Sequence, residues 1–233
     1  MQAILTFHCI DARDHVLSIR PEELRSLLRA VTTAGFRLVR LTELLALPAS
    51  VDAVALTFDD GYHSVHEHAE PILREFGAAG TVFLVSSFMG RPQEPRTLTW
   101  AQVESLHQGG WEIGAHTATH VDLRTLGRDA IVQEFAACDA AIHAAIGVRP
   151  RSFAYPFGYF TDDALAVARA HYACAVSTRM GWLGPDRDPH LLPRLDSYYF
   201  RRPGAHRRFG SAGFRAWLGL RALARRARWG RYA

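Results

Sequence analysis

The chain has 233 residues, of which 48% are hydrophobic and 21% are charged. This composition excludes a disordered or collagen-like protein, and the length suits one domain with a sizeable core. The net charge of +4 hides an asymmetry, because all 27 basic residues are Arg and ten lie in residues 201–233, where there is no acidic residue. Residues 1–200 carry 17 Arg against 23 acidic residues. A mildly acidic body therefore precedes a basic tail.

The first residues show neither the basic segment nor the long apolar run of a signal peptide. No stretch approaches the roughly 18 apolar residues of a membrane span. The cysteines, Cys9, Cys138 and Cys174, are odd in number and lack C-x-x-C spacing. We therefore expect a reduced, cytoplasmic protein in which these cysteines serve as small buried apolar residues.

Short β-rich apolar runs alternate with longer helical patterns along the chain. The expected strands are residues 3–7, 37–41, 53–58, 81–85, 111–115, 152–155, 173–177 and 191–195. The expected helices of the body are residues 21–34, 63–76, 100–107, 128–146 and 162–170. Repeated strand–helix units predict an α/β fold with a parallel sheet, either a compact (β/α) barrel or an open doubly wound sheet. In both architectures the chemistry lies at the carboxyl ends of the strands.

Two adjacent carboxylates, Asp59 and Asp60, follow the expected strand at residues 53–58. Neighbouring carboxylates repel each other unless a cation or hydrogen bonds offset the repulsion. One Asp could therefore ligate a metal while the other stays free as a base. The alternative is an ordinary Asp-Gly turn.

Two histidines, His116 and His120, follow the expected strand at residues 111–115 with four-residue spacing. One helical turn would bring both imidazoles to the same side, which suits Zn²⁺ or a similar ion. One Asp and two His would leave coordination positions open, as in catalytic rather than structural zinc sites. A second group of histidines, at positions 63, 66 and 68, is interpreted as the solvent face of a helix.

A third strand end lies between Arg151 and the turn Pro156-Phe157-Gly158. The Arg could pair with a carboxylate and hold it ionised. The rigid turn could present a backbone N–H to an oxyanion. A surface Arg and a plain strand-ending turn are the alternatives.

Taken together and in this order, residues 57–61, 116–120 and 151–158 resemble the motifs of the polysaccharide deacetylase family, also called the NodB-homology family or carbohydrate esterase family 4. Residues 5–8, Leu-Thr-Phe-His, are similar to its first-strand element, and the resemblance extends to about residue 195. It implies a partial (β/α)₇ TIM-like barrel, here assigned to residues 1–200. Residues 201–233 are then an Arg-rich, helical C-terminal extension.

The resemblance also implies the site. Asp60, His116 and His120 would hold a divalent metal, usually Zn²⁺, with Ni²⁺, Co²⁺ or Mn²⁺ as alternatives. Asp59 would be the general base, and Arg151 would orient it.

The backbone N–H of Phe157 would form part of the oxyanion hole. The family's late D-x-x-D-W and L-x-H motifs, which supply the general acid, are absent, and residues 191–195 read Leu-Leu-Pro-Arg-Leu. His8 ends the first expected strand and resembles an active-site His of poly-N-acetylglucosamine deacetylase relatives, so the resemblance makes it the candidate acid, with His190 as a weaker candidate.

The implied function is a metal-dependent hydrolase that removes an N-acetyl group from an amino sugar in a poly-, oligo- or lipid-linked saccharide. The products would be acetate and a free amine. Two alternatives stay open: an amidohydrolase for a small molecule such as a cyclic ureide, and an inactive carbohydrate-binding barrel. The aromatic residues that could stack on a sugar are Tyr62, Phe88, Trp100, Tyr159 and Trp182.

Residues 214–226 predict a basic helix with Trp and Leu on one side and Arg on the other. This pattern suits an anionic membrane surface, and equally a helix packed on the barrel with its Arg outward. No nucleic-acid partner is expected, because no nucleic-acid-binding motif accompanies the basic patch. We expect peripheral contact with the inner face of the membrane, where lipid-linked sugars would be met. No oligomeric state is indicated.

Overall fold

A computed structural model describes residues 1–13, 15–201 and 204–230. The strands are β1 (Gln2–Phe7), β2 (Cys9–Ile10), β3 (Ser18–Ile19), β4 (Arg37–Val39), β5 (Ala53–Phe58), β6 (Thr81–Leu84), β7 (Glu112–Ala115), β8 (Ser152–Ala154), β9 (Cys174–Met180) and β10 (Leu192–Asp196). The α-helices are α1 (Pro21–Thr33), α2 (Leu41–Ala46), α3 (Glu70–Glu75), α4 (Trp100–Gln108), α5 (Arg128–Ile146), α6 (Asp162–His171) and α7 (Ala212–Trp229). The single helix expected at residues 63–76 is instead a π-helical turn, Val65–Ala69, followed by α3.

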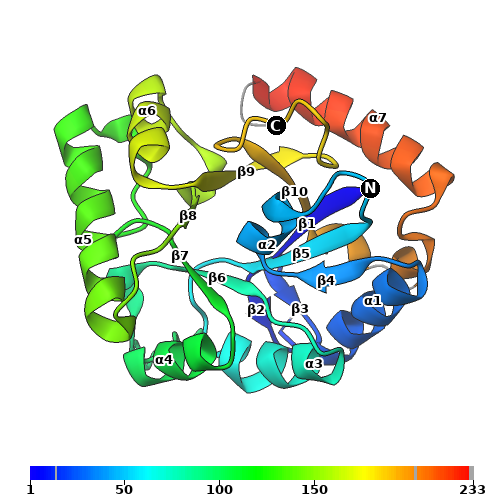
Figure 1. Ribbon diagram of the computed structural model, residues 1–233, viewed down its shortest axis with the longest axis horizontal. Coiled ribbons are helices and arrows are strands. Elements are labelled where there is room, and N and C mark those ends of the chain that lie inside the picture. The colour runs from blue at the N-terminus through cyan, green and yellow to red at the C-terminus, as the bar shows by residue number, and fades with distance from the viewer. Residues whose placement is uncertain (14, 202–203, 231–233) are drawn as a thin grey trace.

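Seven parallel strands close into a barrel. β1 pairs with β10 on one side and with β5 on the other, and β6 to β9 complete the circle in chain order. β4 adds to the first half of β5, whose second half pairs with β6. Figure 1 shows the α-helices other than α2 as a ring around the strands, with α7 between α6 and α1. The expected (β/α)₇ barrel is confirmed, and the open doubly wound sheet is wrong.

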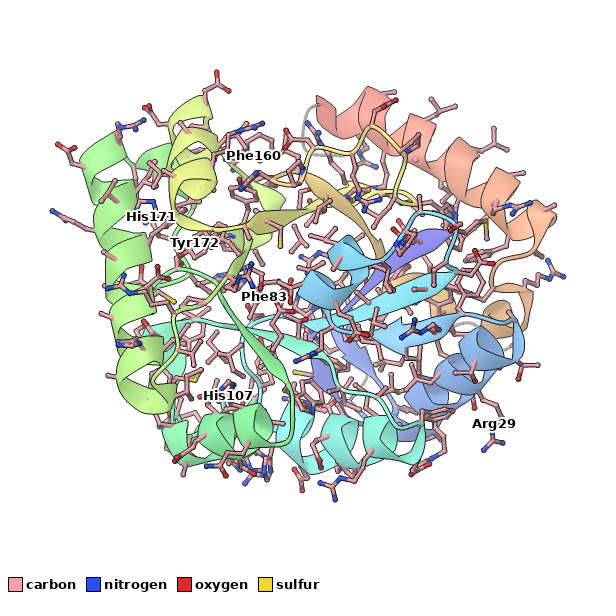
Figure 2. The ribbon with its side chains drawn as sticks, in the orientation of Figure 1. Arg29, Phe83, His107, Phe160, His171 and Tyr172 are labelled. Carbon is pink, nitrogen blue, oxygen red and sulfur yellow. The ribbon has the colours of Figure 1, made fainter. Side chains whose placement is uncertain are left out.

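The middle of the barrel is filled by apolar side chains. Ile4 of β1 registers with Ala55 of β5, and both belong to the same small buried cluster as Phe83. Phe83 lies at the centre of the ring of strands (Figure 2). Gly114 on the neighbouring β7 leaves room for this ring, since a Cβ there would lie 2.5 Å from Phe83 Cδ1. Helix α2 covers the amino end of the barrel with Leu41 and Leu44.

Polar side chains replace apolar ones toward the carboxyl end of the barrel. Alternate residues of a strand point to the same side, so the positions that follow Ile4 inward on β1 are Thr6 and then His8. The same spacing on β5 gives Thr57 and then Asp59, and Thr6 registers with Thr57. The interior therefore changes from an apolar floor to a polar layer at the end where β-strand loops carry chemistry.

Helix α7 covers the outside of the barrel after its last strand. Phe214 and Leu218 are buried in the same core cluster as Phe209, and the ring of Phe209 packs edge-on against Phe36. The basic C-terminal helix expected from the sequence is confirmed, and its apolar face joins the main core. None of the described helices is long and apolar enough to cross a membrane.

Candidate active site

Asp59 and Asp60 follow β5 directly, and both side chains are nearly buried, with residue exposures of 3% and 7%. Asp60 has a left-handed backbone with φ 69°. This conformation is uncommon for a residue other than glycine and turns the chain sharply between the two carboxylates. The adjacent carboxylates therefore meet different partners, which removes the mutual repulsion expected for a side-by-side pair.

Asp60 lies against the two histidines. Its Oδ1 atom is 3.4 Å from Nε2 of His116 and 3.4 Å from Nε2 of His120. One ligand atom from each of the three residues lies within 4.8 Å of the other two. Asp60 Oδ1 is buried without a hydrogen-bond partner. An orphaned carboxylate oxygen facing two imidazole nitrogens fits a divalent cation such as Zn²⁺.

His116 is held in the orientation that a metal ligand needs. It follows β7, and its Nδ1 is 2.7 Å from the carbonyl oxygen of Ala154 at the end of β8. Nδ1 therefore carries the proton and donates it to that carbonyl, which leaves Nε2 as the ligand atom.

His120 reaches the site through a loop rather than the expected helical turn. Both Thr117 and His120 have left-handed φ values, of 68° and 59°. The His120 N–H donates to Thr117 Oγ1 at 2.9 Å, which closes the loop. The imidazole rings of His116 and His120 consequently meet edge-on, 4.8 Å apart. The i, i+4 spacing was right for proximity but the helical reason for it was wrong.

The three side chains perturb one another's protonation. Burial opposes ionisation of Asp60, but the close approach and charge of the His116 imidazole outweigh burial and hold the pKa of Asp60 well below its usual range. Burial and the neighbouring His116 lower the pKa of His120 to about 4. Burial also opposes charge on His116, yet the adjacent carboxylates of Asp60 and Asp59 raise the pKa of His116. At neutral pH Asp60 is therefore an anion and His120 a neutral imidazole, the forms in which they bind metals.

Asp59 pairs with Arg194, a residue that the sequence reasoning did not select. Arg194 Nη1 donates to Asp59 Oδ1 and Nη2 donates to Oδ2, both at 2.7 Å, and the guanidinium is itself buried. Burial alone would raise the pKa of Asp59, but the charge and hydrogen bonds of Arg194 lower it below the usual value. Asp59 is thus a fixed, ionised carboxylate.

The expectation that Arg151 orients Asp59 is wrong in geometry. Arg151 precedes β8 and is exposed at the amino end of that strand, whereas Asp59 lies at the carboxyl end of β5. In a parallel barrel these are opposite ends. The signal for Arg194 was a charged residue inside the otherwise apolar run at residues 191–195, two positions after the inward-facing Leu192.

His8 is at the site and His190 is not. His8 follows β1, and its Nε2 is 3.9 Å from Asp59 Oδ2 with a side chain that is partly open to solvent. His190 Nε2 instead contacts the carbonyl oxygen of Tyr172, which precedes β9 at the other end of the barrel.

Phe157 occupies a strained turn beside the metal ligands. Its φ of 57° is left-handed, and its ring packs edge-on against His120 at 4.5 Å. The following Gly158 has φ 72°, and a Cβ there would lie 2.0 Å from Thr178 Oγ1, so only glycine fits. Asp60, Thr117, His120 and Phe157 are the non-glycine residues with left-handed φ in the described part of the chain. All of them surround this site, where strain of this kind concentrates.

Aromatic rings line one side of the site. Phe88 and Phe157 flank His120, with ring centroids 6.1 and 4.5 Å away, and Tyr159 lies 6.1 Å beyond Phe157. The guanidinium of Arg124 stacks 3.6 Å above the Tyr159 ring. Among the other aromatic candidates, Trp182 packs with Phe36 and Phe209 beneath α7 rather than beside the histidines.

A family model described as polysaccharide deacetylase matches residues 47–175. The YxkH protein of Bacillus subtilis is 27% identical over 147 residues, which is 63% of this chain and 52% of that protein. A poly-beta-1,6-N-acetyl-D-glucosamine N-deacetylase of Staphylococcus aureus is 22% identical over 158 residues, 61% of this chain and 53% of that protein. The chain thus spans about half the length of these curated relatives.

Solved structures share the fold. IcaB from Ammonifex degensii superposes with a TM-score of 0.77 and 22% identity, over 88% of this chain and 97% of that one. The deacetylase PplD of Streptococcus pyogenes, solved in complex with acetate, gives 0.76 and 24%, over 83% and 91%. The family match covers more than half of the chain and includes the carboxylate pair, both histidines and the Phe157 turn. The chain therefore belongs to the polysaccharide deacetylase family.

Proposed function

We propose that this protein is a metal-dependent N-deacetylase that hydrolyses the N-acetyl group of an amino sugar within a saccharide, giving acetate and a free amine. The observation that carries the proposal is the buried, unpartnered Oδ1 of Asp60 between two imidazoles, with the ionised Asp59 beside it. Family membership supports carbohydrate deacetylation, and the donor set supports the metal.

Asp60, His116 and His120 would hold the cation. Two imidazole nitrogens and one carboxylate oxygen suit Zn²⁺ and leave positions open for water and substrate. When bound, a divalent cation at this point supplies Lewis-acid chemistry, polarising a carbonyl and making water more acidic.

Asp59 is suited to accept the proton of the attacking water. The two hydrogen bonds from Arg194 fix the plane of its carboxylate, yet each oxygen keeps a second lone pair for water. The low pKa of Asp59 means that the base is already deprotonated at neutral pH.

His8 is suited to carry a proton to the leaving amine. Its ring is near Asp59 and partly open to the solvent side of the site. The backbone N–H of Phe157, in the strained turn beside His120, would donate to the developing oxyanion.

The aromatic lining supports a saccharide as substrate. The Phe157 residue is 54% exposed, an unusual state for an aromatic residue. Its position beside His120 places an apolar face where a sugar ring bearing the acetamide could stack.

Acetate release tests the proposal. Purified protein is incubated with N-acetylglucosamine oligomers and, separately, with cyclic ureides, with and without a chelator, and the Asp60→Asn variant serves as the inactive control. We expect acetate from the oligomers alone, lost on chelation and restored by Zn²⁺. Hydrolysis of ureides alone would replace the saccharide with a small-molecule amide, and oligomer binding without any turnover would indicate an inactive binding barrel.

A further inference from the structure

The inner face of α7 packs against the barrel. Phe214 and Leu218 are buried, and the guanidinium of Arg225 donates to Tyr199 Oη and to the carbonyl oxygen of Thr178, both at 3.3 Å. Phe214, Leu218 and Arg225 are spaced by four and then seven positions, about one and two helical turns, as one face of a helix requires. The orientation of the helix about its own axis is therefore fixed.

The outer face of α7 is apolar where a packed surface helix is normally polar. Leu220 and Leu223 are 69% and 66% exposed. At 3.6 residues per turn they lie opposite Phe214 and Leu218. Ala216 and Ala227 are on the same side and are also exposed. We call the solvent-facing set Ala216, Leu220, Leu223 and Ala227 the outer stripe.

Arginines border the outer stripe on both sides. Helical spacing places Arg215 along one edge and Arg221 and Arg228 along the other, and all three are exposed. The guanidinium of Arg221 lies 5.2 Å above the ring of Trp217, which is itself partly exposed. No acidic residue occurs between positions 201 and 233.

We propose that the outer stripe and its bordering arginines form a docking surface for an anionic lipid bilayer. Leucines in the centre of the surface can enter the boundary between headgroups and acyl chains. Arginines at its edges can keep their charge among the lipid phosphates while their stems lie along the apolar zone. The helix lies on the bilayer in this arrangement and does not span it.

Charge favours a membrane over a second copy of the chain. Two α7 helices packed through their outer stripes would bring rows of arginines together without an acidic partner. A purely electrostatic partner such as a nucleic acid would leave the leucines without a role, because phosphate contacts need only the arginines.

Helix α7 packs against the wall of the active site through its inner face. Arg225 on the inner face of α7 contacts Thr178, and Thr178 is the residue that excludes a side chain at Gly158 of the Phe157 turn. A bilayer on the outer stripe would therefore be separated from this wall by the width of α7, about 10 Å, a distance that a lipid-linked saccharide can span. That choice of substrate rests on the proposed function, whereas the docking surface itself does not.

Sedimentation with vesicles tests the docking surface without using activity. The full chain is mixed with phosphatidylglycerol or phosphatidylcholine vesicles at low and high salt. We expect binding to phosphatidylglycerol that weakens at about 0.5 M salt, and little binding to phosphatidylcholine. The double variant Leu220→Ser/Leu223→Ser should bind about tenfold more weakly. Arg215→Gln/Arg221→Gln should lose affinity mainly at low salt.

Matched controls distinguish binding through this surface from non-specific binding through exposed charges or apolar side chains elsewhere. Val16→Ser/Val148→Ser removes two apolar side chains of similar exposure elsewhere. Arg29→Gln/Arg149→Gln removes two exposed charges away from α7, and Figure 2 shows Arg29 pointing outward from α1. Both controls should bind like the unaltered chain. Unchanged binding by the Leu220/Leu223 variant would overturn the proposal, as would failure of the unaltered chain to bind phosphatidylglycerol at low salt. A dimer that this variant dissolves would identify a second copy as the occupant.

Discussion

The two ends of the barrel both carry buried or half-buried carboxylates, but the hydrogen bonding of these carboxylates differs. At the amino end, Glu112 accepts hydrogen bonds from Ser152 Oγ at 2.6 Å, the Thr42 N–H at 2.9 Å and Thr42 Oγ1 at 2.8 Å. At the carboxyl end, Asp60 Oδ1 is buried and has no hydrogen-bond donor. One end satisfies its carboxylate completely, and the other leaves an oxygen for something outside the chain.

This difference separates a structural polar cluster from a functional one. An unsatisfied buried carboxylate oxygen costs free energy, of about 1–3 kcal/mol or more for a charged group. Left-handed non-glycine residues add to that cost at the carboxyl end, at Asp60, Thr117, His120 and Phe157. An unsatisfied anionic oxygen and four left-handed non-glycine residues gather at the carboxyl end of the barrel, and this concentration of cost is expected at a binding site.

The largest effect is expected for Asp60→Asn. Loss of the anionic ligand should remove the cation, and with it the several kcal/mol that a metal contributes to hydrolysis, or about 10³-fold in turnover. At neutral pH the variant should unfold at a lower temperature than the metal-free chain, because His116 stabilises the Asp60 anion in the folded state and that stabilisation is lost. Metal content by mass spectrometry and acetate release measure the two parts. Retained zinc with normal turnover would contradict the assignment.

Asp59→Asn should separate catalysis from metal binding at the same strand end. We expect acetate release to fall by about 10²–10⁴-fold, since the general base is lost. The metal content should stay near that of the unaltered chain, because Asp59 is turned toward Arg194 rather than the histidines. Loss of metal together with turnover would instead make Asp59 a ligand.

Arg194 and Arg151 test which arginine belongs to the site. Arg194→Met leaves Asp59 buried without its partner, and breaking a buried ion pair by removing one member typically costs about 3–5 kcal/mol. Arg194→Lys should recover part of the stability while losing the two-point hydrogen bonding that orients Asp59. Arg151→Met, at an exposed position, should change the free energy of unfolding by no more than about 0.5 kcal/mol and should leave the turnover rate unchanged. Thermal unfolding and acetate release distinguish the three variants.

The order of strands and helices could be predicted because these elements are locally encoded, whereas the choice of a barrel over an open sheet came from the family resemblance. The β-rich run at residues 53–58 and the amphipathic segment at 128–146 appear at those positions as β5 and α5. The three ligand candidates also come together, because parallel strands deliver their carboxyl ends to one place.

The partner of Asp59 could not be predicted in the same way. It depends on which residues of strands distant in sequence point inward, and Asp59 and Arg194 are separated by 135 positions. The resemblance selected Arg151 by motif position, while the inward register of β10 selects Arg194. The loop between His116 and His120 was not predicted for a related reason. Spacing alone does not distinguish a helical turn from a loop with left-handed residues.

At the amino end, Glu112→Gln should affect stability and leave catalysis intact. The amide introduces a donor where Thr42 and Ser152 already donate, so we expect a loss of about 1–3 kcal/mol in the free energy of unfolding. Turnover of the folded fraction should be unchanged. Denaturant unfolding alongside acetate release gives both values. A large loss of turnover in the folded protein would mean that the two ends are coupled.

The smallest effect is expected at Asp139 of α5, a buried carboxylate that is only partly satisfied. Tyr172 Oη donates to its Oδ1 at 2.8 Å, but burial outweighs this bond and raises the pKa of Asp139 above its usual value. The folded chain therefore binds this proton more tightly than the unfolded chain. Stability should rise as pH falls through the raised pKa toward the ordinary carboxyl value of about 4. Asp139→Asn should remove that increment, so the difference in unfolding temperature between the two proteins should change across this window and nowhere else. If the difference is constant with pH, Tyr172 satisfies Asp139 as completely as the amino-end donors satisfy Glu112.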